Sequence, residues 1–215
     1  MFGASGLRYS ENKDDLDASK HFLELTNRES AMLERVTSEY DDVIVVVNAA
    51  NAMELGFVEE YDSISSVLWC PGTGQSGFNS LGSILAGEIN PSAKTSDTFV
   101  RDLTATPTFN NFGNFKYDNM SEFDTSEGGA SFVNYTDGIY VGYRFWETAA
   151  EEGFIDYDDA VQYPFGYGLS YTTFEQEMGD LNVSDGNISV DVTITNTGDV
   201  AGKDVAEIYY NPPYT

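Results

Sequence analysis

The chain has 215 residues, and its hydrophobic content of 41%, with 14 Phe, 14 Tyr and 2 Trp, suffices for one large or two small domain cores. Its formal charge of -26, from 36 acidic and 10 basic residues, would repel nucleic acid and anionic membrane surfaces, so we expect neither as a partner. No apolar run approaches the roughly 20 residues needed to span a bilayer.

The first predicted elements are a helix and a strand. The opening residues lack the apolar core of a signal peptide, and we expect the chain to start inside a longer protein. Thr26 followed by Glu29 matches a capping box, and the apolar spacing after it predicts a helix over residues 27–39. Residues 43–48 are a β-branched run that is apolar on both faces, as in a central parallel strand covered by helices.

The same alternation continues along the chain. Helical residues around 53–61, a strand over residues 66–70 and a helix over residues 77–86 complete a β-α-β-α order. This order predicts an α/β fold with a mostly parallel, doubly wound sheet.

Two later segments depart from this order. Residues 103–136 are rich in Asn, Phe, Thr and Gly without periodicity, which predicts a long surface excursion. Beyond residue 187, apolar and polar residues alternate on both sides of the turn-forming sequence NTGDVAG. This pattern predicts a strand, a turn and a second strand of a β-sandwich, so we place a domain boundary after residue 174.

Three motifs carry a resemblance to a known family. Residues 163–174 read YPFGYGLSYTTF, residues 67–99 read VLWCPGTGQSGFNSLGSILAGEINPSAKTSDTF, and residues 137–147 read DGIYVGYRFWE. Together they resemble glycoside hydrolase family 3, the β-glucosidase family, from about residue 8 to the C-terminus. The chain departs from the family pattern at Ala93, Thr95 and Ser96, which bears on the exact substrate and not on the family.

The resemblance implies a domain plan, a reaction and partners. Residues 1–174 would be the family's C-terminal α/β sandwich domain, incomplete at its N-terminus, and residues 175–215 a truncated fibronectin III-like domain. The whole enzyme would hydrolyse terminal β-linked sugars with retention, using an aspartate nucleophile on an N-terminal barrel that this chain lacks. The expected partners are therefore a β-linked oligosaccharide or glycoside and that barrel of the same protein, and no sugar-binding residues are assigned.

A retaining glycosidase needs a second carboxyl group that donates a proton. In the family this group is a glutamate on a loop of the second domain. Residues 8–15 read RYSENKDD and are similar to the family's loop at the tyrosine, glutamate, lysine and last aspartate. The resemblance therefore makes Glu11 the candidate catalytic acid/base, against the alternative that it is one more surface acid. Asp14 and Asp15 would then orient the loop, contact sugar or simply face solvent.

The remaining reactive side chains have plainer interpretations. His21, the only histidine, lacks a nucleophile motif beside it and is predicted to be structural. Cys70, the only cysteine, lies in an apolar strand and is predicted to be a buried, inert thiol. No His/Cys cluster has metal-ligand spacing, so we expect neither a metal nor a cofactor.

An arginine of the motif over residues 137–147, and aromatic residues of this motif and of the earlier strand, are further candidates for a functional role. Arg144 could hold a domain interface through a carboxylate pair. Four aromatic residues could either pack in the core or present a sugar-stacking face: Trp69, Tyr143, Phe145 and Trp146.

Two other functions stay open at this point. The chain could be a structural or carbohydrate-contacting module without catalysis of its own. It could also bind a dinucleotide, because Gly72, Gly74 and Gly77 form G-x-G-x-x-G after a strand, and Asp97 lies 20 residues beyond Gly77. Against the dinucleotide, Asp97 belongs to the TSDTF sequence that matches the hydrolase pattern, and no catalytic set accompanies the glycines.

Overall fold

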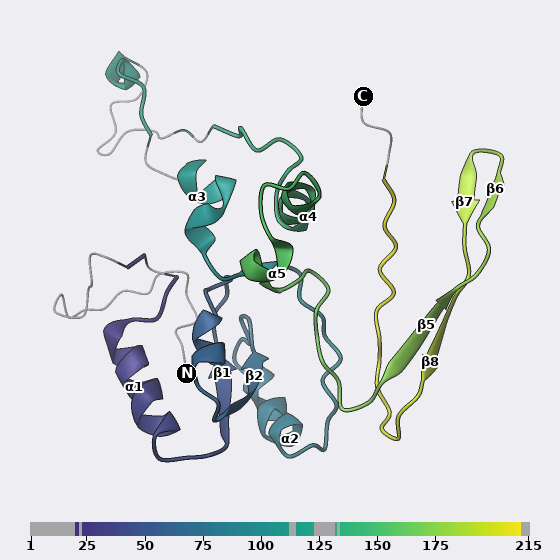
Figure 1. Ribbon diagram of the computed structural model, residues 1–215, viewed down its shortest axis with the longest axis horizontal. Coiled ribbons are helices and arrows are strands. Elements are labelled where there is room, and N and C mark those ends of the chain that lie inside the picture. Colours follow the sequence, from purple (N-terminus) through teal and green to yellow (C-terminus); the bar gives the residue numbers. More distant parts are fainter. Residues whose placement is uncertain (1–19, 22, 112–114, 123–131, 133, 212–215) are drawn as a thin grey trace. The chain divides into compact units, whose positions relative to one another are not determined.

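The computed structural model describes residues 20–21, 23–111, 115–122, 132 and 134–211 (Figure 1). The chain divides into two compact units, which we call the first and the second unit. The first unit is Met1–Gly72 with Asp97–Pro164, and the second is Thr73–Ser96 with Phe165–Thr215. The second unit takes residues from both sides of residue 174, and the expected domain boundary there stays a prediction.

The first unit begins with the predicted order of helix and strand. Its first elements are α1 (Asn27–Thr37), β1 (Val43–Val47), the short 3-10 helix η2 (Gly56–Glu60) and β2 (Ile64–Trp69). β1 and β2 run parallel, and their register places Val47 beside Trp69. The α/β class is confirmed, and the two predicted strands pair as expected.

The N-terminus of α1 has the capping box that the sequence predicts. The hydroxyl of Thr26 accepts from the backbone N–H of Glu29 at 3.3 Å, and the Glu29 carboxylate accepts from the backbone N–H of Thr26 at 2.8 Å. Two of the donors that a helix leaves open at its start are thereby satisfied. Leu33, one turn further on, is buried in the core of the first unit.

Two details of the first unit differ from the prediction. Ile44 in β1 is 48% exposed, so one face of this strand is not fully covered by the described residues. The helix expected over residues 53–61 is reduced to η2, because Met53 and Leu55 lie before it in irregular backbone. Both side chains are buried in the core, and their burial rather than helical periodicity explains why they are apolar.

The core of the first unit collects side chains from α1, β1, the segment around η2 and β3 (Phe99–Val100). β3 pairs antiparallel with β4 (Val161–Tyr163), with Phe99 opposite Tyr163. The Phe99 ring meets the rings of Trp69 and Tyr163 edge-on, at centroid distances of 5.0 and 6.4 Å. The TSDTF sequence and the start of the YPFGYG sequence thus meet in this core.

The later part of the first unit is mostly short helices. These are η4 (Leu103–Ala105), α3 (Pro107–Asn111), η5 (Met120–Glu122), α4 (Tyr143–Glu151) and α5 (Tyr157–Ala160). α4 was not predicted, although Trp146 and Ala149 lie one turn apart on it and are both buried. Trp146 packs with Val100 and Val161 in a second apolar cluster. No helix in the described ranges is long and apolar enough to cross a bilayer.

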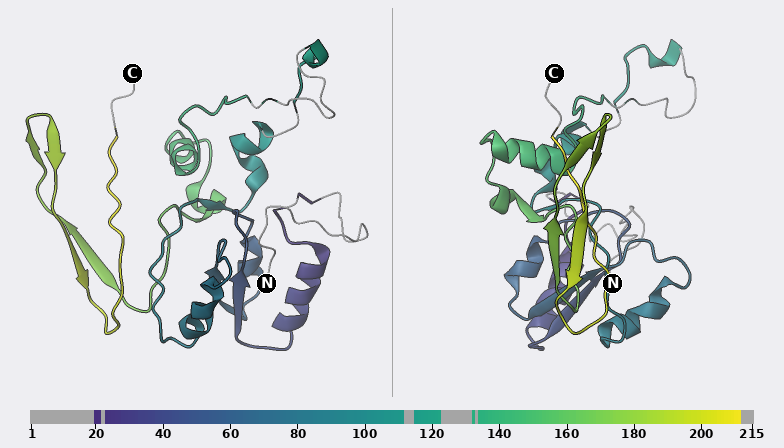
Figure 2. Two further views of the ribbon diagram at one scale, coloured as in Figure 1. Left: turned by 180° about the vertical axis from the view of Figure 1, so that it is seen from behind. Right: turned by 90° about the vertical axis from the view of Figure 1, so that its right-hand side faces the viewer.

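The second unit contains short helices and a two-stranded ribbon. Its elements are η3 (Gly77–Ser80), α2 (Leu81–Leu85), β5 (Phe174–Met178), β6 (Asn182–Ser184), β7 (Asn187–Ser189) and β8 (Val192–Asn196). β5 pairs antiparallel with β8, and β6 with β7. Both views in Figure 2 show the β6–β7 hairpin continuing the β5–β8 ribbon. The predicted helix over residues 77–86 is present as η3 followed by α2.

The second strand predicted after NTGDVAG is absent from the described part of the chain. Residues 203–210 form no backbone ladder with another segment. Instead, the amide nitrogen of the Gln176 side chain donates to the Val205 carbonyl at 3.1 Å and to the Asp204 carboxylate at 2.7 Å. A side chain contact replaces the row of backbone hydrogen bonds that would define a strand.

Candidate functional site

The candidate acid/base cannot be placed in the structure. Glu11, Asp14 and Asp15 lie outside the described residues, so the assignment of Glu11 stays a prediction.

The two longest family motifs bind each other in the second unit. The backbone N–H of Thr95 donates to the Tyr167 carbonyl at 2.7 Å, and the N–H of Gly166 donates to the Thr95 carbonyl at 2.8 Å. The Lys94 ammonium donates to the Gly168 carbonyl at 2.6 Å. The NPSAKT and FGYG sequences are therefore structural partners, joined mainly through backbone groups.

The Asn90 side chain makes three hydrogen bonds in this junction. Its carbonyl oxygen accepts from the Tyr171 N–H at 2.8 Å and from the Ser170 hydroxyl at 3.0 Å, and its amide donates to the Ala201 carbonyl at 3.1 Å. Lys94 also pairs with Asp204 at 3.4 Å. The hydrogen bond from the Gln176 side chain lowers the pKa of the Asp204 carboxyl below its usual range, and the Lys94 ammonium lowers it further.

Gly168 is required by close backbone contact in this junction. A Cβ added there would lie 2.5 Å from the Ala93 carbonyl oxygen. We expect Gly168→Ala to lower the free energy of unfolding of the second unit by about 1–3 kcal/mol, since a backbone atom cannot yield as a side chain can. Urea denaturation, monitored by the hydrogen exchange of backbone amides in the second unit, measures this change in unfolding free energy.

Gly82 is the matched control for this substitution. It lies inside α2, and an added Cβ would have nothing within 4 Å. Gly82→Ala should leave stability unchanged or raise it by up to about 1 kcal/mol, because alanine favours helix over glycine. Equal effects of the two substitutions would show that the junction is looser than the structure indicates.

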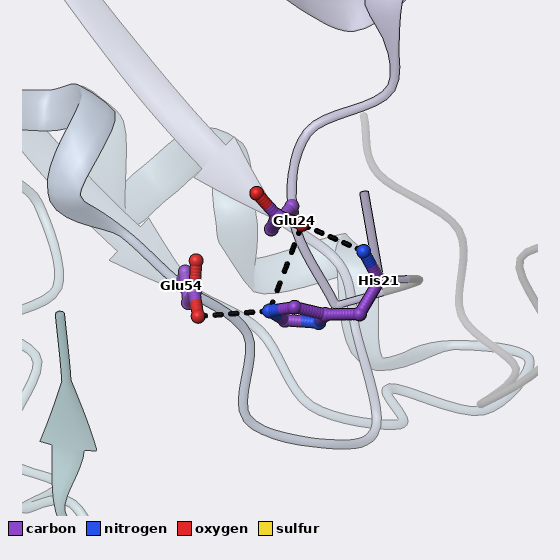
Figure 3. Close-up of side chains that lie close together, drawn as sticks. All are labelled: His21, Glu24 and Glu54. Carbon is purple, nitrogen blue, oxygen red and sulfur yellow. Dashed lines mark hydrogen bonds and ion pairs between the residues drawn. The ribbon is translucent and has the colours of Figure 1, made fainter. Parts of the chain in front are cut away.

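A cluster of three ionisable side chains lies in the first unit (Figure 3). The imidazole Nε2 of His21 is 2.9 Å from Oε1 of Glu54 and 3.7 Å from Oε2 of Glu24. The three side chains are half-buried, with 17%, 17% and 30% of the His21, Glu54 and Glu24 side chains exposed. His21 thus contacts Glu24, Glu54 and Leu23, and its predicted structural role stays a prediction.

Sequence reasoning did not find this cluster. His21 and Glu54 are separated by 33 residues, and only the fold brings them together. Nothing in the sequence indicated that Glu54 lies near His21. Within the cluster, only His21 and Glu24, three residues apart, are close in sequence.

A hollow of about 260 Å³ borders the cluster. Its lining combines both carboxylates of the cluster with other charged and apolar groups: Lys20, Glu24, Leu25, Ser30, Glu54, Gly56, Phe57, Glu60 and Arg101. Arg101 forms an ion pair with Glu59 and, with Gln162, holds the pKa of the Glu59 carboxyl below its usual range. Lys20 donates to the Leu25 carbonyl at 3.1 Å.

The structure shows how two of the four candidate aromatic residues pack. Trp69 packs against the core of the first unit and donates its indole N–H to the Ala49 carbonyl at 3.1 Å, while Trp146 is only 4% exposed. Core packing is therefore the correct alternative for Trp146, and Trp69 is half-buried against the core. Cys70 lies directly after β2 and is half-buried rather than fully buried as predicted. The burial that it has raises the pKa of its thiol.

Arg144 is exposed at the start of α4. Its guanidinium lies over the Tyr143 ring, 5.6 Å from the centroid, and it has no carboxylate partner among the described residues. The interface pair expected of Arg144 stays a prediction.

The geometry does not support a dinucleotide site. Gly77 begins a four-residue 3-10 helix, and the following α2 has only five residues. The dinucleotide fingerprint instead places the pyrophosphate at the N-terminus of a full α-helix.

The family is shown by comparison with known proteins. The sequence profile of the glycosyl hydrolase family 3 C-terminal domain matches residues 4–143. The chain therefore belongs to glycoside hydrolase family 3, as the motifs predicted.

Several of the relatives it resembles are β-glucosidases. Beta-glucosidase A of Butyrivibrio fibrisolvens is 36% identical over 204 residues, an alignment covering 88% of this chain and 22% of the relative. The β-glucosidase of Ruminococcus albus is 31% identical, with 97% of this chain and 19% of the relative covered. The chain thus spans about a fifth of the length of these curated relatives.

Solved structures give the same result. A β-glucosidase from Paenibacillus barengoltzii is similar with a TM-score of 0.65 and 30% identity, over 81% of this chain and 17% of that one. β-Glucosidase 3B from Thermotoga neapolitana, solved in complex with α-D-glucose, gives 0.61 and 32%, over 82% and 22%.

Proposed function

We propose that this chain is part of a retaining β-glycosidase of the β-glucosidase type, which hydrolyses terminal β-linked sugars. The observation that carries the proposal is the family match over residues 4–143, together with the β-glucosidases among the similar relatives and structures. The activity belongs to the whole protein, because this chain corresponds to about a fifth of such an enzyme.

In the proposed reaction the two catalytic carboxyl groups come from different domains. An aspartate on the barrel attacks the anomeric carbon, the glycosidic C–O bond breaks, and the leaving oxygen takes the proton of Glu11. Glu11, now a carboxylate, then removes a proton from water as that water attacks the glycosyl-enzyme, which restores both groups.

The described residues would supply the scaffold of this arrangement. We propose that the parallel β1–β2 pair belongs to the doubly wound α/β sandwich of the family, over residues 1–174. The ribbon of β5 and β8 would then begin the fibronectin III-like domain of residues 175–215. The contacts of Thr95 with the FGYG sequence, and of Asn90 with Ser170 and Tyr171, support a structural role for these motifs.

The test uses a full-length enzyme that joins this chain to its barrel. Proton NMR during hydrolysis of an aryl β-glucoside should show the β-anomer of the sugar first, with the α-anomer appearing only as the β-anomer mutarotates. An α-anomer formed first would indicate inversion. Absence of hydrolysis of every β-glycoside tested would favour the non-catalytic module.

A further inference from the structure

The cluster of His21, Glu24 and Glu54 has the composition of a metal site. One ligand atom from each side chain can be chosen so that all three lie within 4.8 Å of one another. An imidazole with two carboxylates suits zinc, which binds nitrogen and oxygen ligands, better than magnesium or calcium, which prefer oxygen alone. The two carboxylates would also balance the charge of a divalent cation.

Backbone groups hold both carboxylates in place. Oε2 of Glu24 accepts from the backbone N–H of His21 at 2.7 Å, and Oε1 of Glu54 accepts from the backbone N–H of Leu103 at 2.7 Å. The His21 ring packs edge-on against Phe109, at a centroid distance of 5.5 Å. Such outer contacts orient metal ligands and reduce the cost of assembling them.

The separations of the ligand atoms suit a small cation. Zinc binds nitrogen and oxygen at about 2.0–2.1 Å, so two ligands of a tetrahedral site lie about 3.3 Å apart. The distances from Nε2 of His21, 2.9 Å to Glu54 and 3.7 Å to Glu24, lie on either side of this value. Figure 3 shows the two carboxylates converging on the same nitrogen.

We propose that His21, Glu24 and Glu54 bind one zinc ion, with the adjacent hollow giving it access to solvent. Water would complete the coordination, as in zinc sites with three protein ligands. The spacing of His and Cys had given no reason to expect a metal, because Glu54 comes from a distant part of the chain. The site would tie the segment before α1 to the connection between β1 and β2.

Zinc binding changes the tautomer of the His21 ring. Nδ1 accepts from the backbone N–H of Leu23 at 3.3 Å, which assigns the proton of the neutral ring to Nε2, where it faces Glu54. A metal on Nε2 displaces that proton, and the neutral ring then carries its proton on Nδ1. The hydrogen bond from the Leu23 N–H to Nδ1 is then lost, and this N–H must form a hydrogen bond with water instead.

The test exploits the single histidine of this chain. In the ¹⁵N-labelled 215-residue chain, long-range ¹H–¹⁵N spectra should show the Nε2–H tautomer, and one equivalent of zinc should convert it to the Nδ1–H tautomer. Calorimetry should give one site with Kd on the order of 1 μM, weaker than structural zinc sites with four ligands.

Variants separate this site from general binding to an acidic surface. Glu54→Gln and His21→Gln should weaken zinc binding at least about tenfold. Glu60→Gln, which removes an exposed carboxylate lining the same hollow, should leave the Kd unchanged. Circular dichroism of each variant checks that it is folded.

Two results would overturn the proposal. One is a His21 ring that keeps its tautomer at saturating zinc. The other is an equal loss of affinity in Glu54→Gln and Glu60→Gln.

Discussion

Glu11→Ala in the full-length enzyme is expected to slow cellobiose hydrolysis by roughly 10²-fold or more, the usual scale of general acid catalysis. A sugar alkoxide is a poor leaving group and needs a proton as the C–O bond breaks. A nitrophenolate hardly needs one, so glycosylation by activated aryl glucosides should suffer much less. Steady-state kinetics with both substrates measure the difference.

Azide provides the control for the second half of this reaction. It attacks the glycosyl-enzyme without base assistance, so it should restore turnover in Glu11→Ala and give a β-glycosyl azide. Equal small losses on both substrates, without an azide product, would identify Glu11 as a surface carboxylate. Asp14→Asn and Asp15→Asn would then be the next variants to test.

Trp146→Ala should lower the free energy of unfolding of the first unit by about 3–5 kcal/mol, the range for loss of a buried tryptophan. The side chain is 4% exposed and packs with Val100 and Val161. Its removal leaves a cavity between α4 and the β3–β4 pair that neighbouring side chains cannot fill completely. Urea denaturation monitored by circular dichroism gives the change.

Phe154 is the matched aromatic control in the same unit. It is 80% exposed, and Phe154→Ala should change stability by no more than about 0.5 kcal/mol. A similarly small effect of Trp146→Ala would show that this side chain contributes little to the core.

Elements set by local chemistry were predictable from the sequence. The capping box of Thr26 and Glu29 lies within four consecutive residues, and the β-branched run before Asn48 favours a strand wherever it packs. Their parallel pairing followed from the order of elements. The family motifs were equally readable, since closely spaced glycines and aromatics such as Gly166 and Tyr167 seldom occur by chance.

Features set by tertiary contact were not predictable. α4 follows Gly142, which has a positive φ of 58° and gives no side chain cap, so no start signal marked it. The residues before η2 are apolar because the core buries them and not because they form a helix. The strand expected over residues 203–210 depended on a partner that the described residues do not supply, and the neighbours of His21 depended on the fold.

The interleaving of the two units has a consequence for the order of synthesis. Thr95 meets Tyr167 across 72 residues, and all of residues 97–164 belong to the first unit. At translation rates of about 5–20 residues per second, the ribosome adds those 72 residues in roughly 4 to 14 s. During that interval the NPSAKT segment lacks its FGYG partner, and the first unit is itself completed only at the end of the interval, when Tyr163 is available to pair with Phe99. Newly made chains should therefore be open to proteases and chaperones at residues 90–95 until Gly168 leaves the exit tunnel.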